Sequence, residues 1–409
     1  MSKAYDVIVV GARCAGSPTA MLLARSGYDV LLVDRATFPS DMMSTHLIHP
    51  PGVAALKRWG VLEQLRATGC PPMTTYAYDL GPFVITGSPR PADGVTEAFC
   101  PRRIVLDELL VRAAAAAGAE LREGFVVDEI LVEDGVVTGV RGHGTGGGTV
   151  TERARVVVGA DGRNSLVAKA VGAERYNAVP AQEATYYAYW SGLEMDRAEL
   201  FLRGEQRRAW AAFPTNDELS CVAVGWPRAQ FEINRADYET HYMNALELAP
   251  AFAERVRSAT RETRFTATAD LPNFFRTPYG PGWALVGDAG YHKDPITAQG
   301  IADAFRDAES VAAALDDALA GRRPYDEAMA SYQTARDEAS LPLYGLTCEF
   351  ATMEPPPPEM QQLLAAVSRS RQASDDFVSA MAGTLPVPEF FDAGNTERII
   401  REAGQGVPS

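Results

Sequence analysis

Asp288 is the residue in this chain that is best placed to bind a ligand rich in hydroxyl groups. It follows Gly287 and an apolar run at residues 283–286, and a helical pattern begins near Ala298. The run suits a buried strand, and glycine lets the backbone turn sharply where the strand ends. An ionised carboxylate there accepts hydrogen bonds from hydroxyls, and the free N–H groups at the start of the helix favour an anion. This stretch of the sequence therefore predicts one half of a site that binds a nucleotide-like ligand.

Apolar residues at helical spacing support the helix that follows Asp288. They are Ile301, Ala304, Phe305, Ala308, Val311, Ala312 and Leu315. Spacings of three and four positions place these side chains on one face of an α-helix. The ligand contacts expected from this block are Gly287, Asp288, Pro295, Gln299, Gly300 and Ile301.

The start of the chain carries a complete strand, turn, helix and strand unit. Its parts lie at residues 5–10, 11–16, 19–26 and 30–33. Asp34 ends the second strand, 23 residues after Gly11, where a carboxylate binds the hydroxyls of an adenosine ribose. NAD and FAD both use this unit, so it does not distinguish them. The contacts expected from it are Gly11, Arg13, Ala15, Gly16, Asp34 and Arg35.

Arg13 departs from the glycine pattern of such a turn. It stands where a middle glycine lets the backbone approach the pyrophosphate. Either its guanidinium turns onto the phosphates, or it points to solvent and the backbone contact is looser. The sequence leaves both orientations open.

A third block, a buried-strand pattern at residues 156–160 followed by Asp161 and Gly162, completes an ordered set. The three blocks resemble the dinucleotide fingerprint, the middle Asp-Gly motif and the late Gly-Asp motif of the para-hydroxybenzoate hydroxylase-like FAD-dependent oxidoreductases. That family includes group A aromatic monooxygenases, flavin-dependent halogenases and geranylgeranyl reductases. The resemblance spans residues 5–345, implies FAD as cofactor, and makes Arg103 similar to the family's flavin-contacting arginine.

Two departures from the family pattern affect the late block. Where the pattern has a glycine and an asparagine after Pro295, this chain has Ala298 and Ala302. The histidine that usually follows the Gly-Asp motif is shifted by one position, to His292. We expect FAD binding to survive these changes with altered geometry over the flavin ring.

The expected fold class is α/β, with a Rossmann-like FAD-binding domain, a second domain built on an antiparallel sheet, and C-terminal helices. Strand and helix patterns alternate at the start, strands dominate the middle, and helices end the chain. The FAD-binding domain is expected at residues 1–72, 100–178 and 270–345, the substrate domain at 73–99 and 179–269, and the helical segment at 346–409. In that last segment one helix is expected over residues 359–382.

Composition excludes several classes of partner. A formal charge of −15 argues against nucleic-acid phosphates and anionic membranes. The five cysteines have neither metal-binding nor disulfide spacing, no leader pattern precedes the first strand, and no apolar run reaches about 18 residues. We expect a soluble cytoplasmic protein that folds without disulfides and holds no metal.

The expected substrate pocket lies between the flavin ring and the sheet of the second domain. Aromatic residues that could stack on a planar substrate there are Tyr187, Tyr189, Trp210, Phe213 and Trp226. The alternative for each of them is ordinary core packing.

Three histidines are candidates for acid and base chemistry, because imidazole titrates near neutral pH. His46 and His49 follow the ribose-binding Asp34, and His292 follows the late motif. A structural histidine that bonds the backbone is the alternative for each.

The resemblance implies a monooxygenase that hydroxylates an aromatic substrate, such as a polyketide-like secondary metabolite, through a C4a-hydroperoxyflavin with NAD(P)H and O₂. A halogenase would show a tryptophan-pair signature that residues 210–214 lack, and a geranylgeranyl-type reductase would show a cysteine that residues 38–43 lack. A fourth possible function is that of a non-catalytic flavin-binding redox sensor. One Rossmann unit implies that NAD(P)H binds transiently or that a partner flavin reductase supplies electrons, and a homodimer stays open.

Overall fold

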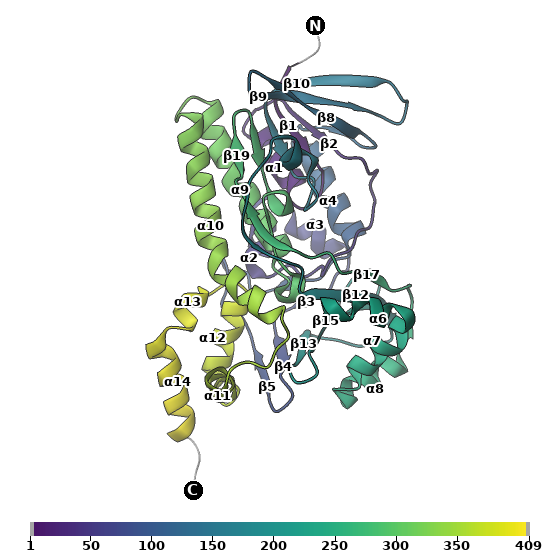
Figure 1. Ribbon diagram of the computed structural model, residues 1–409, viewed down its shortest axis with the longest axis vertical. Coiled ribbons are helices and arrows are strands. Elements are labelled where there is room, and N and C mark those ends of the chain that lie inside the picture. The colour runs from purple at the N-terminus through teal and green to yellow at the C-terminus, as the bar shows by residue number, and fades with distance from the viewer. Residues whose placement is uncertain (1–3, 406–409) are drawn as a thin grey trace.

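A mainly parallel sheet forms the centre of the upper lobe in the computed structural model, which describes residues 4–405 (Figure 1). Its parallel strands run in the order β20-β10-β1-β2-β7. They are β1 (Ala4–Val10), β2 (Val30–Val33), β7 (Glu120–Arg122), β10 (Thr149–Gly159) and β20 (Trp283–Leu285). The valine-rich runs predicted here are buried on both faces, as in α/β proteins. The expected α/β class with a Rossmann-like domain is confirmed.

The register of this sheet brings three loops to one edge. Val10 pairs with Val33 on one side and with Gly159 on the other, and Gly159 pairs with Leu285. Parallel strands that end in register place the loops that follow them side by side. The first turn, the Asp161 motif and the Asp288 motif therefore meet, although they lie far apart in the sequence.

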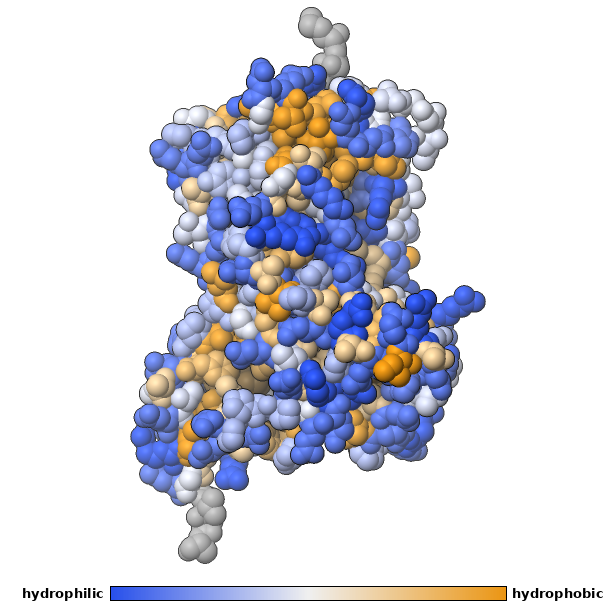
Figure 2. Space-filling model, viewed as in Figure 1, coloured by the Kyte–Doolittle hydropathy of each residue, from blue (hydrophilic) through white to orange (hydrophobic). Residues whose placement is uncertain are grey.

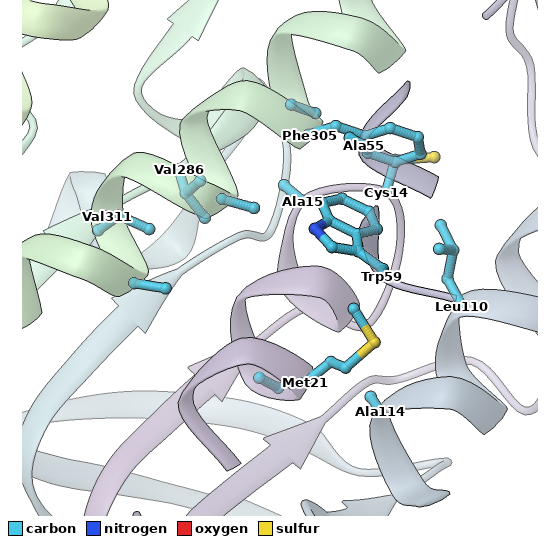
Figure 3. Packing of buried hydrophobic residues seen from close by; sticks show 14 of the residues in the cluster. Cys14, Ala15, Met21, Ala55, Trp59, Leu110, Ala114, Val286, Phe305 and Val311 are labelled. Carbon is cyan, nitrogen blue, oxygen red and sulfur yellow. The ribbon is translucent and has the colours of Figure 1, made fainter. Parts of the chain in front are cut away.

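Helices cover one face of the parallel sheet. They are α1 (Gly16–Arg25), α4 (Arg103–Ala116) and α9 (Gly300–Leu319). Figure 3 shows how Met21, Leu110 and Val311 from these helices gather in one apolar cluster. The long helix α10 (Tyr325–Phe350) runs along α9, and its Tyr332 hydroxyl donates to the Leu285 carbonyl at 2.8 Å.

An antiparallel ribbon covers the other face of the sheet. It consists of β8 (Val126–Glu133), β9 (Val136–His143) and the first half of β10. Inward residues of the ribbon are buried, whereas Val126, Val132, Val136 and Val150 are exposed, and Figure 2 shows an apolar area at this end of the molecule.

The lower lobe is built on a second, mostly antiparallel sheet, as expected (Figure 1). Its strands are β4 (Tyr76–Asp79), β5 (Val84–Gly87), β12 (Glu183–Ser191), β13 (Ala198–Arg203), β14 (Arg208–Pro214), β15 (Leu219–Pro227), β16 (Thr260–Arg261) and β17 (Thr266–Thr268). Helices α7 (Tyr238–Leu246) and α8 (Pro250–Ser258) pack on one face of this sheet. These strands fall within the ranges expected for the substrate domain, whose limits remain predictions.

Four helices follow α10 and pack against β4 and β5. They are α11 (Pro358–Val367), α12 (Arg371–Met381), α13 (Val387–Phe390) and α14 (Ala393–Gln405). The single helix expected over residues 359–382 is wrong, because the chain breaks between α11 and α12. Ser370 caps α12 by accepting a hydrogen bond from the Ala373 N–H. Among residues 4–405, no helix combines the length and apolarity that crossing a membrane requires.

Candidate functional site

The first turn packs directly against the loop that follows β10. A Cβ on Gly11, whose φ is +102°, would lie 2.4 Å from the Ala160 carbonyl oxygen, and a Cβ on Gly16 would lie 1.7 Å from the Gly11 carbonyl oxygen. No side chain fits at such distances, so only glycine allows this crossing. The two glycines therefore keep the backbone open where a pyrophosphate would approach.

The late motif lies against the same turn. Gly287 has a φ of +58°, and a Cβ there would lie 2.7 Å from the Cβ of Ala15. Asp288 follows it with an exposed side chain, and no residue within 4–405 donates a hydrogen bond to its carboxylate. A small cavity of about 20 Å³ is lined by Asp288 and by Gly300, the first residue of α9. The two predicted halves of the ligand site thus form one surface, with a free carboxylate and a helix N-terminus.

Asp34 ends β2 beside this turn. Its Oδ2 accepts a hydrogen bond from the Ala12 N–H at 2.8 Å, and its Oδ1 accepts one from the Ala36 N–H at 2.8 Å. Each carboxylate oxygen accepts more than one hydrogen bond, so both keep capacity for ribose hydroxyls. The neighbouring Arg35 is exposed.

Arg13 takes neither of the orientations that the sequence left open. Its guanidinium turns onto α4, where Nη1 lies 2.5 Å from Oδ2 of Asp107 and Nη2 donates to the Ser40 hydroxyl at 3.0 Å. Asp107 is fully buried and also accepts hydrogen bonds from Nε and Nη2 of Arg103. Asp107 is not among the site residues predicted from the sequence, although its place four residues after Arg103 on one helix is a recognisable pairing signal.

Arg103 connects α4 to the late motif. Burial acts to lower the pKa of its guanidinium, but the neighbouring Cys14 and Asp107, and then Asp288, outweigh burial and raise it. The side chain therefore stays charged close to the Asp288 carboxylate. Contact between Arg103 and the cofactor remains a prediction.

Asp161 organises the loop after β10. Its Oδ2 accepts hydrogen bonds from the Leu166 and Val167 N–H groups at the start of α5 (Leu166–Ala170), and burial raises the pKa of its carboxyl. Its Oδ1 is buried without a partner in the described part of the chain. Asp161 thus holds α5 in place and leaves one oxygen free at the sheet edge.

The structure shows the surroundings of the two substituted positions, 298 and 302, in the late block. Ala298 adopts a left-handed conformation with a φ of 53°, which accounts for the glycine at this position in the family. A Cβ added to Gly52 would lie 3.2 Å from the Cα of Ala302, so α2 (Pro50–Arg58) leaves little room for a larger residue there. Gln299 donates its amide to the Met381 carbonyl at 2.6 Å and so points toward the C-terminal helices.

His46 lies together with two of the expected substrate residues. Its Nε2 is 2.6 Å from the Tyr189 hydroxyl, and its ring meets Tyr187 edge-on with the ring centroids 5.7 Å apart. Burial, followed by the charges of Arg103 and Arg102, lowers the pKa of His46 to about 3, so the imidazole is neutral. Its Nδ1 is buried without a partner among residues 4–405.

The other two histidines hold backbone in place. His49 contacts the Tyr76 hydroxyl through Nδ1 at 2.9 Å and the Thr297 carbonyl through Nε2 at 3.3 Å. Burial lowers the pKa of His49 to about 4. His292 lies in a separate small sheet and bonds the Pro272 carbonyl.

The five expected substrate residues do not form one wall. Tyr187 and Tyr189 pack with Cys221 and with Met43 from the upper lobe. Trp210 and Trp226 lie on the opposite face of the sheet, in the core beneath α7 and α8. Side chains alternate along a strand, so residues an odd number of positions apart, such as Trp210 and Phe213, point to opposite faces. Phe213 belongs to the cluster formed with the C-terminal helices.

Comparisons with known proteins identify the family and the fold of this chain. A family model described as an FAD binding domain matches residues 4–341. The 6-methylpretetramide 4-monooxygenase of Streptomyces rimosus is 29% identical over 325 residues, which cover 78% of this chain and 76% of that protein. The tryptophan 2-halogenase of Chondromyces crocatus is 27% identical over 345 residues, which cover 81% of this chain and 65% of that protein. The solved structure of the myxobacterial chondrochloren halogenase CndH matches with a TM-score of 0.80 at 23% identity, over 100% of this chain and 98% of that one.

The chain belongs to the FAD-binding family of para-hydroxybenzoate hydroxylase-like oxidoreductases and is an FAD-dependent enzyme. The glycine crossing at the sheet edge and the free Asp288 carboxylate fit an elongated dinucleotide. In this arrangement Asp34 would hold the adenosine ribose, Asp288 the ribityl chain, and the N-terminus of α9 an anionic flavin ring.

Proposed function

We propose that this enzyme is a monooxygenase that hydroxylates an electron-rich aromatic substrate, with NAD(P)H or a partner reductase as the source of electrons. Bound FAD supplies oxygen activation, and the protein supplies placement, charge and exclusion of water. A monooxygenase among the relatives supports oxygenation as the reaction.

The main support is a chain of side chains that leads from the cofactor motif to a pair of tyrosines. Asp288 raises the pKa of Arg103, and the positive charge of Arg103 lowers the pKa of His46. His46 in turn bonds the hydroxyl of Tyr189. A planar substrate that stacks on Tyr187 and Tyr189 would therefore lie close to the expected position of the flavin ring.

His46 and Tyr189 can move a proton without either group carrying a charge at rest. Burial raises the pKa of the Tyr189 phenol above its usual range, and the pKa of His46 is lowered to about 3. A neutral phenol and a neutral imidazole in contact exchange donor and acceptor roles, and Nδ1 of His46 is left for a substrate hydroxyl. Arg102, whose guanidinium carbon lies 5.1 Å from the centroid of the Tyr189 ring, favours a substrate that becomes anionic.

The positions of the lysines favour hydroxylation over halogenation, which would need a lysine near the substrate. Within residues 4–405, Lys57 donates to the Asp93 carbonyl, Lys169 is exposed on α5, and Lys293 pairs with Asp303. Lys293 also lines the small cavity at Asp288 and Gly300, and none of the three lysines has a hydrogen bond or ion pair with Tyr187 or Tyr189.

Anaerobic reduction by NADH or NADPH, followed by stopped-flow mixing with oxygen and a panel of phenols, tests the proposal. The expected product carries one oxygen atom from isotopically labelled O₂. Substrate conversion without incorporation of label, or incorporation of a halide, would overturn the assignment. His46→Gln should lower turnover while it leaves the FAD absorbance spectrum and FAD content unchanged.

A further inference from the structure

Arg276 is a buried arginine that the proposed reaction does not use. It is 3% exposed, and its guanidinium donates hydrogen bonds to two main-chain carbonyls. Nη1 donates to the Ala289 carbonyl at 2.6 Å, and Nη2 donates to the Arg163 carbonyl at 2.9 Å. Ala289 directly follows Asp288, and Arg163 lies two positions after Asp161. One side chain therefore connects the late motif to the loop after β10.

The charge of Arg276 makes these two hydrogen bonds costly to break. Within residues 4–405 the guanidinium forms no ion pair, so the two carbonyls are its main partners. Burial, followed by the positive charge of Arg175, lowers the pKa of Arg276 to about 10, and Asp161 acts in the opposite direction. A buried charged group that loses its hydrogen-bond partners carries a large free-energy cost. The two loops therefore cannot move apart without that cost.

The strand that carries Arg276 is itself fixed in place. Arg276 ends β18 (Asn273–Arg276), and its guanidinium carbon lies 4.4 Å from the centroid of the Phe274 ring on the same strand. The Arg276 N–H donates to the Gly290 carbonyl at 2.7 Å. Arg336 of α10, which is also buried, donates to the carbonyls of Arg276 and Gly290 at 3.1 Å and 3.3 Å. The side chain thus extends from an anchored backbone, so its two contacts can fix the loops.

We propose that Arg276 is a positioning residue of the FAD site, which ties the loop at Asp288 to the loop at Asp161. The Asp288 carboxylate would then meet the ribityl chain at a fixed place relative to the loop after β10. Arg276 acts through these loops and not by touching the cofactor. This role needs only FAD binding and is independent of hydroxylation.

Titration of FAD into apoprotein variants tests the tie. Arg276→Met should bind FAD about tenfold more weakly or worse, because hydrogen bonds from a charged group are lost. Arg276→Lys keeps the charge but lacks the planar fork that reaches both carbonyls, so it should also bind more weakly than the wild type. Arg175→Met is the control, because Arg175 is exposed and packs on the same Phe274 ring, and it should bind FAD as the wild type does. Wild-type affinity in Arg276→Met, or in Arg276→Lys, would overturn the tie.

Hydrogen exchange of the apoprotein separates the tie from a general loss of stability. The Gly290 N–H donates to the Gly287 carbonyl, and the Leu166 N–H donates to Asp161. Arg276→Met should speed exchange at both amides, while amides of β14 in the lower lobe keep the wild-type rate. Unchanged exchange at Gly290 and Leu166, or an equal rise in β14, would overturn the proposal. If Arg276→Met does not fold, Arg276→Lys serves for both measurements with the same expected direction. A failed hydroxylation assay leaves these binding and exchange results unaffected.

Discussion

Replacing Asp107 with alanine should destabilise the protein more than any other single change around the first turn. The Asp107 carboxylate is fully buried and pairs with Arg103, whose side chain is 8% exposed, and with Arg13, whose side chain is 22% exposed. Without Asp107, the buried guanidinium of Arg103 loses the carboxylate that accepts its hydrogen bonds, and Asp288 is left to act on its charge. Removal of one partner from a buried ion pair costs about 3–5 kcal/mol, and we expect Asp107→Ala to lose that much free energy of unfolding.

Urea unfolding of the apoprotein, followed by tryptophan fluorescence, measures this loss. The matched control is Glu108→Ala, on the same helix, because Glu108 pairs with Arg112 and both side chains are partly exposed. Such a surface pair contributes about 0–1 kcal/mol. If Asp107→Ala and Glu108→Ala lower the free energy of unfolding equally, our reasoning about the buried pair is refuted.

A double variant separates charge from packing. Arg103→Met combined with Asp107→Leu removes both buried charges, and apolar replacement of a buried ion pair is often neutral. The double variant should therefore recover most of the stability lost in Asp107→Ala, yet bind FAD weakly because Arg103 is gone. Stability as low as that of Asp107→Ala would point to a cavity as the cause.

The remaining predictions concern the aromatic residues and His46. Tyr189→Phe removes the hydrogen bond to His46 and should lower the rate of hydroxylation in the steady-state assay, while it leaves thermal stability within about 1 kcal/mol of the wild type. Trp226→Phe should do the reverse, because Trp226 stacks on Tyr186 in the core away from the site: stability falls and the Michaelis constant for the aromatic substrate stays the same. Equal effects of both changes on turnover would contradict the assignment of the two faces. Burial lowers the pKa of His46 in the folded protein to about 3 from 6.5, so the stability that the neutral ring contributes is fully present above pH 6.5 and is lost as the pH falls toward 3. A His46→Phe variant should show a smaller fall in melting temperature over that range, and identical slopes for both proteins would contradict the burial of His46.

The sequence was sufficient to predict the elements that build the cofactor site. Strong apolar runs identified β1, β2 and β20, and helical spacing identified α9. The meeting of the three loops follows from parallel strands, because their carboxyl ends share one edge. In the upper lobe, the local sequence patterns therefore agree with the observed fold.

Side-chain orientation was harder to predict because it depends on distant elements. The direction of Arg13 is set by Asp107 on α4. In contrast, the opposite faces of Trp210 and Phe213 follow from strand alternation alone, so the sequence did contain that signal.

The helix break before Ser370 also had a local signal. Serine is a preferred N-cap residue, and Ser370 stands in that role at the start of α12. An N-cap residue inside an otherwise helical pattern therefore indicates a boundary.

Titration of FAD into the apoprotein tests most directly the claim that widely separated loops grip one cofactor. The wild type should bind one FAD per chain. Asp288→Ala should bind it about tenfold to a hundredfold more weakly, because a hydrogen bond to a charged group is lost. Asp93→Ala, which removes an exposed aspartate paired with Arg58, should bind FAD as the wild type does. A wild-type protein that takes up no FAD, or an Asp288→Ala variant with unchanged affinity, would contradict the account.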